Sequence, residues 1–213
     1  MNFKTTLAVM GAAAAVFVAT PAAAVTYQLN NGGSAFTGLA SWGTVDLVQS
    51  GVDVNFTVTL ASGFDFVTTG NQNSKASFAF NASGVVLADI INIDTPSSQT
   101  YAAWAPGNNS PFGTFTFGIY CSTCGSGASN ADPDPLTFKV KNSLISEFLS
   151  TSTGGTAAYF AADIFGPSGS GQGATGAVGT TGLIPVIPEP QTYALMLAGL
   201  AAVGFMARRR RQG

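Results

Sequence analysis

The chain has 213 residues, of which only 8% are charged, and it carries a formal net charge of −2 with no histidine. Between residues 25 and 187 there are three lysines, nine carboxylates and no arginine. A body with so few cations lacks the side chains that neutralise phosphates, so the composition excludes nucleic acid as a partner.

The N-terminus has the three-part layout of a secretory signal peptide, and residues 1–24 are predicted to form a signal helix that is removed. Lys4 precedes an apolar stretch over residues 7–18, and Ala22 and Ala24 occupy the small-residue positions of the expected cleavage site. Cleavage after Ala24 makes Val25 the first residue of the mature protein. The apolar stretch is shorter than a membrane-spanning helix needs, which disfavours an uncleaved anchor.

Residues 25–165 are predicted to form one all-β domain, because apolar residues recur at every second position between turn-forming residues. The clearest case is a β-hairpin over residues 45–60, in which the alternating apolar face includes Val52, Val54 and Phe56 and Gly51 permits a tight turn. Further strand candidates lie at residues 26–29, 75–82, 84–92, 112–121, 134–142 and 157–166, and a short helix is expected at 143–149. This pattern favours an antiparallel β-sandwich or jelly roll.

Cys121 and Cys124 are the only cysteines of the chain. In an exported protein they meet an oxidising compartment, so a disulfide between them is expected. A redox site would place the first cysteine at a helix N-terminus, whereas turn-forming residues follow here, and a zinc site would need two further Cys or His ligands. The favoured interpretation is a structural bridge that staples a turn.

Catalytic groups are scarce in the body, since the usual proton shuttle and zinc ligand, histidine, is missing. Asp132 and Asp134 are the closest carboxylate pair; they suggest a turn first, and a calcium site or a hydrolase pair as alternatives. Asp65 and Asp163 are expected on the solvent side of alternating strands. The sequence therefore predicts a protein that is not an enzyme and has no cofactor or metal.

The composition changes after Gly166, where Gly, Ser, Thr and Pro dominate. Such a segment has little apolar surface to bury, so residues 166–186 are predicted to be a flexible linker between the domain and the C-terminus.

The C-terminal segment, residues 187–213, combines Pro188, Glu189 and Pro190 with an uncharged, mostly apolar run over residues 193–207. The cluster Arg208, Arg209, Arg210 and Arg211 follows directly. As a helix the run measures roughly 22 Å, short of a hydrocarbon core of roughly 30 Å, although arginine stems can extend its reach. We predict a single transmembrane helix with the arginines on the cytoplasmic side and the body outside that membrane.

This order of a Pro-Glu-Pro triplet, an apolar span and a terminal Arg cluster resembles the PEP-CTERM protein-sorting signal, a tail that is also called the ice-binding protein C-terminal domain. The resemblance implies that a membrane-embedded peptidase, the exosortase, recognises Pro188, Glu189 and Pro190, cleaves near them and passes the body to the cell surface or extracellular matrix. It also implies a host that makes exopolysaccharide and a transient stay in the inner membrane. It assigns no catalytic residue to the body.

Two interpretations of the body follow. The first is a non-enzymatic surface or matrix protein that is sorted by its tail. The alternative is an adhesin-like module that binds exopolysaccharide or another cell surface through exposed aromatic rings, with Tyr101 and Trp104, and also Trp42, as stacking candidates. The same rings could instead cover the edge of the core.

Overall fold

The computed structural model describes residues 23–69, 76–168, 171–182, 196 and 199–200. The described strands are β1 (Ala24–Gln28), β2 (Gly43–Ser50), β3 (Asp53–Leu60), β4 (Asp65–Phe66), β5 (Phe78–Phe80), β6 (Ile90–Asp94), β7 (Tyr101–Trp104), β8 (Gly107–Asn109), β9 (Gly113–Phe115), β10 (Phe117–Cys121), β11 (Leu136–Val140), β12 (Phe160–Ser168) and β13 (Gly171–Gly179). They are joined by the 3-10 helices η1 (Leu87–Asp89), η2 (Ala128–Asn130) and η3 (Ile145–Phe148). Every described strand pairing is antiparallel, so the all-β, antiparallel prediction is confirmed. The helix expected at residues 143–149 is the 3-10 turn η3.

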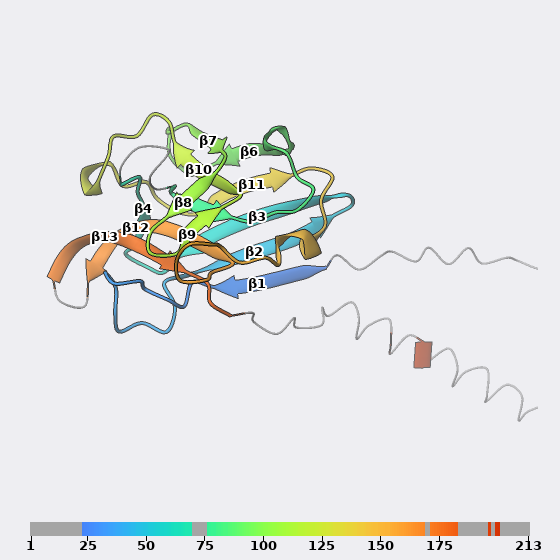
Figure 1. Ribbon diagram of the computed structural model, residues 1–213, viewed down its shortest axis with the longest axis horizontal. Helices are drawn as coiled ribbons and strands as arrows, with labels where there is room; N and C mark the ends of the chain where they lie inside the picture. The colour runs from blue at the N-terminus through green and yellow to red at the C-terminus, as the bar shows by residue number, and fades with distance from the viewer. Residues whose placement is uncertain (1–22, 70–75, 169–170, 183–195, 197–198, 201–213) are drawn as a thin grey trace, which may run out of the picture.

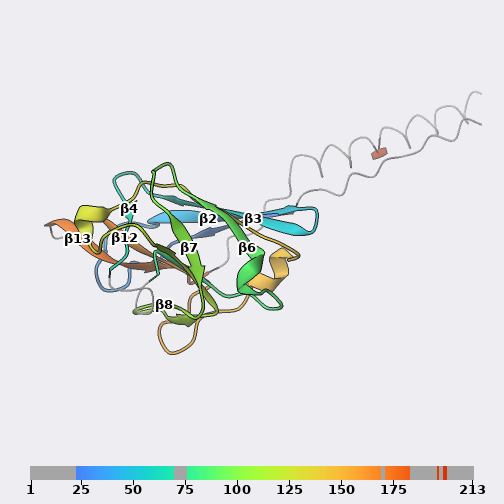
Figure 2. The same cartoon turned by 90° about the horizontal axis from the view of Figure 1, so that it is seen from above.

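The strands form two main sheets (Figures 1 and 2). The first sheet has five strands in the spatial order β1-β2-β3-β11-β6. The second has six strands: five lie side by side in the order β13-β12-β5-β10-β7, and β4 pairs with β12. The short strands β8 and β9 form a separate pair. Both main sheets join strands that are distant in sequence.

The predicted hairpin is formed by β2 and β3, which pair from Gly43 opposite Leu60 to Ser50 opposite Asp53. Gly51 has a φ of 64°, which a tight two-residue turn requires and a residue with a side chain rarely adopts. Val52 is the second residue of that turn and is 68% exposed, so its predicted place on the buried face is wrong. The alternation of buried and partly exposed residues in β3 begins after the turn, with Val54 as its first buried residue.

The core contains a cluster of phenylalanine rings centred on Phe56 of β3. Its ring lies 4.4 Å from Phe138 of β11 and 4.9 Å from Phe148 of η3. It also lies 5.5 Å from Phe80 and 6.2 Å from Phe160, which belong to the second sheet. The same cluster therefore joins the two sheets.

The linker prediction for residues 166–186 is wrong where β13 forms. Strand β12 continues to Ser168, and β13 pairs with it from Ala161 opposite Gly179 to Ser168 opposite Gly171. A Cβ atom at Gly176 would lie 2.5 Å from the Cβ of Ala35, and one at Gly179 would lie 2.7 Å from the ring of Phe112. These glycines permit close packing, so the composition that suggested flexibility belongs in part to a packed edge strand.

The effect of a methyl group at Gly179 tests this interpretation. We expect Gly179→Ala to lower the free energy of unfolding by about 1–3 kcal/mol, because the added carbon overlaps the buried Phe112 ring. Gly182→Ala is the matched control, since its Cβ would meet nothing closer than the Asn30 side chain at 3.8 Å. The measurement is urea denaturation of both variants, and equal midpoints would contradict the packing role.

Candidate functional site

The predicted sorting residues Pro188, Glu189 and Pro190 and the arginines at 208–211 lie outside the described residues. Of the predicted membrane span at 193–207, the structure describes residues 196, 199 and 200. Over the part of the chain that the structure describes, no helix has the length and apolar character to cross a membrane.

Among the described residues, the last contacts that hold the chain before the C-terminal tail lie at the edge where β13 meets the segment after β1. Gly179 and Asn31 exchange two backbone hydrogen bonds, of 2.8 and 3.0 Å. Two residues later, the backbone N–H and the hydroxyl of Thr181 both donate to the side-chain oxygen of Asn30, at 2.9 and 3.0 Å. The body thus holds the chain as far as Thr181, a few residues before the Pro-Glu-Pro triplet.

The predicted signal-peptide cleavage site lies at the start of β1. Ala22 and the residues before it are outside the described residues, whereas Ala24 and Val25 pair with Val48 and Leu47 of β2. The carbonyl of Ala23 also accepts a hydrogen bond from the backbone N–H of Gln49 at 2.8 Å. A peptidase needs an extended chain that is not already paired in a sheet, so we expect cleavage to precede the docking of β1.

The aromatic residues expected as ligand platforms are mostly inside the protein. Tyr101 is 7% exposed and Trp42 is 4% exposed, so their prediction as exposed stacking residues is wrong. Both contribute to the main hydrophobic core. Trp104 is partly exposed, and its ring meets that of Tyr120 edge-on, with centroids 6.3 Å apart. Trp104 and Tyr120 are therefore the aromatic pair that remains at this surface.

The carboxylates of the predicted Asp132–Asp134 pair contact different parts of the fold. Asp132 is buried, and one of its oxygens accepts a hydrogen bond from the Thr95 hydroxyl at 2.8 Å. Asp134 accepts a hydrogen bond from the backbone N–H of Leu60 at 3.1 Å. Burial, together with the adjacent Asp132 carboxylate, raises the pKa of Tyr101 well above its usual range. Each carboxylate thus has a local structural partner.

The other two candidate carboxylates differ in exposure. Burial, and then repulsion from Asp134 and Asp132, raises the pKa of Asp65, which is partly exposed. The prediction that Asp163 lies on the solvent side is wrong, because it is fully buried in β12. Thr69 donates both its backbone N–H, at 2.8 Å, and its hydroxyl to the carboxylate, which offsets the cost of this burial. Within the described ranges, no group of three or more His, Cys, Asp or Glu side chains is placed to hold a metal ion.

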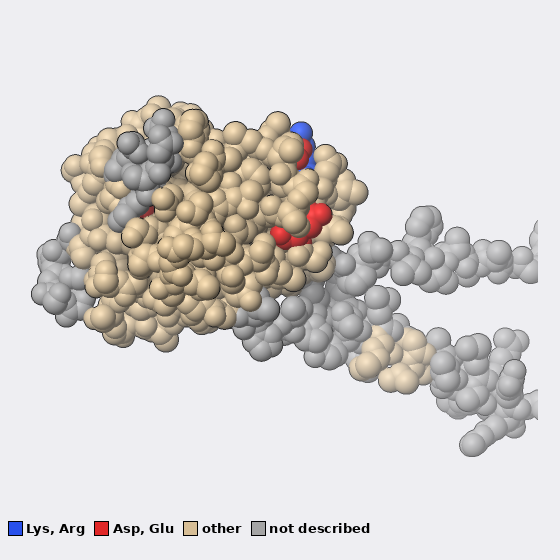
Figure 3. All heavy atoms as spheres, in the orientation of Figure 1, with Lys and Arg blue, Asp and Glu red and all other residues tan. Residues whose placement is uncertain are grey.

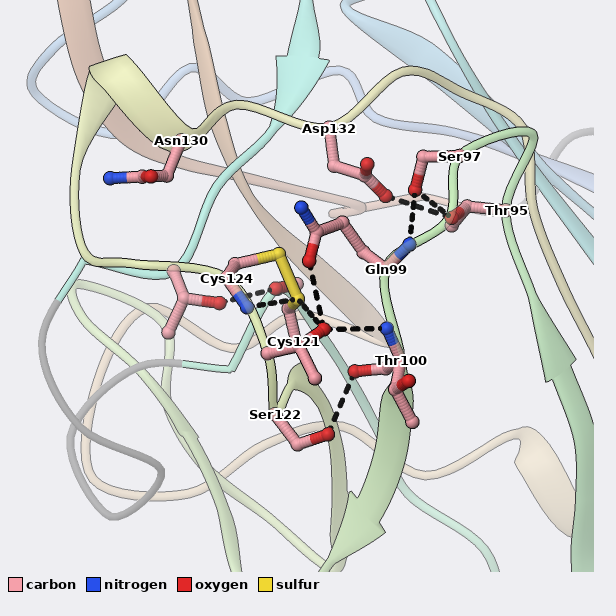
Figure 4. The surroundings of a disulfide bond; sticks show 12 residues. Thr95, Ser97, Gln99, Thr100, Cys121, Ser122, Cys124, Asn130 and Asp132 are labelled. Atoms are coloured by element: carbon pink, nitrogen blue, oxygen red, sulfur yellow. Dashed lines mark hydrogen bonds between the residues drawn. A yellow bond between two sulfur atoms is a disulfide. The ribbon is translucent and has the colours of Figure 1, made fainter.

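The predicted disulfide between Cys121 and Cys124 is present, at the end of β10 (Figure 4). The turn that it closes is bound to the chain before β7: the hydroxyl of Thr123 accepts from the Thr100 N–H and donates to Gln99, both at 2.8 Å. The backbone N–H of Ser122 donates to the carbonyl of Thr100 at 2.7 Å. The bridge therefore fixes a turn that hydrogen bonds already hold.

Reduction of this disulfide should cost little stability. Closing so small a loop restricts the unfolded chain only slightly, so we expect a loss of about 2 kcal/mol or less with the fold retained. The measurement is urea unfolding of the oxidised and reduced protein, followed by tryptophan fluorescence, to which the buried Trp42 and the partly exposed Trp104 contribute. Loss of the cooperative transition on reduction would contradict a local stapling role.

A set of exposed aliphatic side chains at one end of the body was not predicted from the sequence. Val52, Val86 and Leu144 are 68%, 60% and 55% exposed. Charged groups are sparse on the face drawn in Figure 3, and most of those visible lie toward the same end. The available signal was the apolar doublets at residues 85–86 and 144–145, because one member of an adjacent apolar pair usually faces outward in an alternating pattern.

Comparison with known proteins identifies the tail. Residues 186–211 match the family model of the PEP-CTERM protein-sorting motif. The resemblance predicted from Pro188, Glu189, Pro190 and the terminal arginines is thereby confirmed. The match covers the tail and leaves the β body outside it. No curated protein and no solved structure matches the chain.

Proposed function

We propose, from the PEP-CTERM protein-sorting motif that this chain carries, that it is an exported, non-enzymatic protein of the cell surface or extracellular matrix. The motif implies exosortase as the sorting machinery. In this proposal the tail holds the precursor transiently in the inner membrane, with its arginines on the cytoplasmic side, until exosortase cleaves near Pro188. The match at residues 186–211 is the observation that carries the proposal.

The body is, in the same proposal, a two-sheet sandwich that serves as the exported cargo. The ring contacts of Phe56 with both sheets support the sandwich interpretation. The non-enzymatic role is supported by the lack of histidine in the chain and by the structural hydrogen bonds of Asp132 and Asp163. The Cys121–Cys124 disulfide suits an oxidising compartment.

A second candidate function is binding of exopolysaccharide through Trp104 and Tyr120. It is favoured by the partial exposure of both rings and by their contact with each other, because aromatic rings at a protein surface can stack on apolar faces of a ligand. Retention of the protein on the host's own polysaccharide, with loss of retention in Trp104→Ala, would support this function. Equal elution of both proteins with the unretained fraction would count against it.

Mass spectrometry of the protein from its native host tests the sorting proposal. We expect the N-terminus at Val25 and the C-terminus close to Pro188. Intact residues 208–213 in most molecules would indicate a permanent anchor and contradict cleavage.

A further inference from the structure

One end of the body displays aliphatic side chains from three separate turns. We define the apolar end as Val52, Val86, Leu87 and Leu144, which are 41–68% exposed. Val52 and Leu144 border an open hollow of about 380 Å³ that Gly51, Asn142, Ser143 and Glu147 complete. Hydrogen bonds join the three turns to one another. The backbone N–H of Ser143 donates to the carbonyl of Val52 at 2.8 Å, and the backbone N–H of Ser83 donates to the carbonyl of Glu147 at 3.1 Å.

Two of the turns hold their exposed residue by the same device. Val86 and Leu144 are both extended and each precedes a 3-10 helix, η1 or η3. The backbone N–H of each residue donates to a carboxylate three residues later, Asp89 or Glu147, at 3.1 Å in both cases. Because the backbone is fixed in this way, Val86 and Leu144 stay exposed, whereas Val85 and Ile145 beside them are partly buried against the core.

The three carboxylates at this end, Asp53, Asp89 and Glu147, are engaged in local contacts. Asp53 contacts Lys139 at 3.5 Å and accepts a hydrogen bond from the N–H of Asn142 at 3.1 Å. With Asp89, Glu147 and Lys141, the end carries a formal charge of −1 (three carboxylates and two lysines). The small net charge of the apolar end therefore disfavours a partner held by charge attraction and favours one held by apolar contacts.

The apolar end also carries the start of β1, where the mature chain is expected to begin after the signal peptide is removed. Ala24 pairs with Val48, and Ala23 is bonded to the backbone of Gln49. The side chain of Gln49 in turn donates to the carbonyls of Gly51 and Ser143, at 3.1 and 3.0 Å. Both views place the start of β1 at the end of the molecule that carries the β2–β3 turn (Figures 1 and 2).

We propose that the apolar end rests on the outer surface of the membrane that anchors the precursor, with its aliphatic tips at the boundary of headgroups and acyl chains. This inference rests on the anchoring step of the proposed function. Separate projections around a hollow suit a soft lipid interface better than a second copy, because a stable dimer needs a well-packed patch of roughly 800 Å² on each partner. Shallow burial of aliphatic groups in this boundary is favourable without charge attraction.

The tail is long enough to let the apolar end face the membrane, although the chain leaves the body near Asn30, beyond the C-terminal end of β1. From Asn30 back to Ala24 a strand spans roughly 20 Å. The ten residues 183–192 between Gly182 and the apolar run can span up to roughly 33 Å. The membrane can thus contact the apolar end while the tail stays anchored.

Lipid quenching of site-specific probes tests the proposal in the full chain. Val52→Cys, Leu144→Cys and Leu39→Cys are labelled with an environment-sensitive fluorophore without reductant, since the two natural cysteines are paired. Leu39 is the matched control, because it is a 47% exposed leucine in the loop before β2, at the opposite end of the hairpin from its turn. The chains are reconstituted into vesicles of zwitterionic phospholipid that contain nitroxide-labelled acyl chains, and flotation reports anchoring.

We expect quenching of the probes at 52 and 144, but not at 39, and loss of quenching at 52 when Val86→Ser and Leu144→Ser are added. Leu39→Ser in the same background should leave quenching unchanged. Anchored chains with no quenching at 52 and 144, or with quenching at 39 instead, would overturn the inference and leave anchoring intact. If the fluorophore at position 52 instead became protected from water as the amount of protein per vesicle increased, without quenching by lipid, the apolar end would be a contact between copies of the chain. That result would also overturn the inference. Failure to float would refute anchoring, and the inference with it.

Discussion

Replacement of Pro188 and Glu189 by alanine is expected to trap the precursor in the inner membrane of its host. The variant keeps the apolar run and the arginines, so it should still be anchored, whereas the triplet that exosortase is proposed to recognise is lost. We expect nearly all molecules in the membrane fraction, with the C-terminal residues 208–213 retained. Cell fractionation followed by mass spectrometry of the C-terminus measures both effects.

Thr192→Ala is the control for this experiment, because it changes the matched segment without altering the triplet. It should be exported and cleaved as the wild type is. Unchanged export of the Pro188→Ala, Glu189→Ala variant would remove the sorting role of the triplet, whatever the tail does as an anchor. Equal retention of the control would show that the whole segment, and not the triplet, is recognised.

The features that the sequence predicts best are those fixed by neighbouring residues. The β2–β3 hairpin is an example, since its alternation and its Gly51 turn lie within one short stretch. The tail is another, because a linear sorting signal is read from consecutive residues. Such features require no knowledge of what packs against them.

The features that were missed depend on partners far away in the chain. Gly176 and Gly179 look like linker residues until Ala35 and Phe112 are placed against them, which no local pattern reveals. Tyr101 is buried with its hydroxyl beside Asp132, which lies thirty-one positions later in the sequence. The order of strands in the two sheets is nonlocal for the same reason.

The aliphatic residues of the apolar end were missed for a different reason. Whether these side chains point to the core or to solvent depends on the backbone conformation of the turns that carry them. Val52 continues the apolar pattern of β3 in sequence, but the two-residue turn places it outside the sheet. A period-two pattern therefore predicts a strand more reliably than it predicts where the strand begins.

Phe56→Ala is expected to cause the largest loss of stability among single substitutions in the body. The side chain is 1% exposed and contacts rings from both sheets and from η3, so its removal leaves a cavity at the centre of the aromatic cluster. A buried phenylalanine truncated to alanine typically costs about 3–5 kcal/mol, which combines lost transfer energy with the cavity. Urea denaturation followed by tryptophan fluorescence gives the change in the free energy of unfolding.

Leu39→Ala provides the comparison, because the same kind of truncation at a 47% exposed position should change the free energy of unfolding by no more than about 0.5 kcal/mol. If Phe56→Ala lost only as much as this control, the two sheets could not depend on the Phe56 cluster for their association. A large loss confined to Phe56→Ala would instead support a single core shared by both sheets, since a cavity at an interface weakens both of its faces at once.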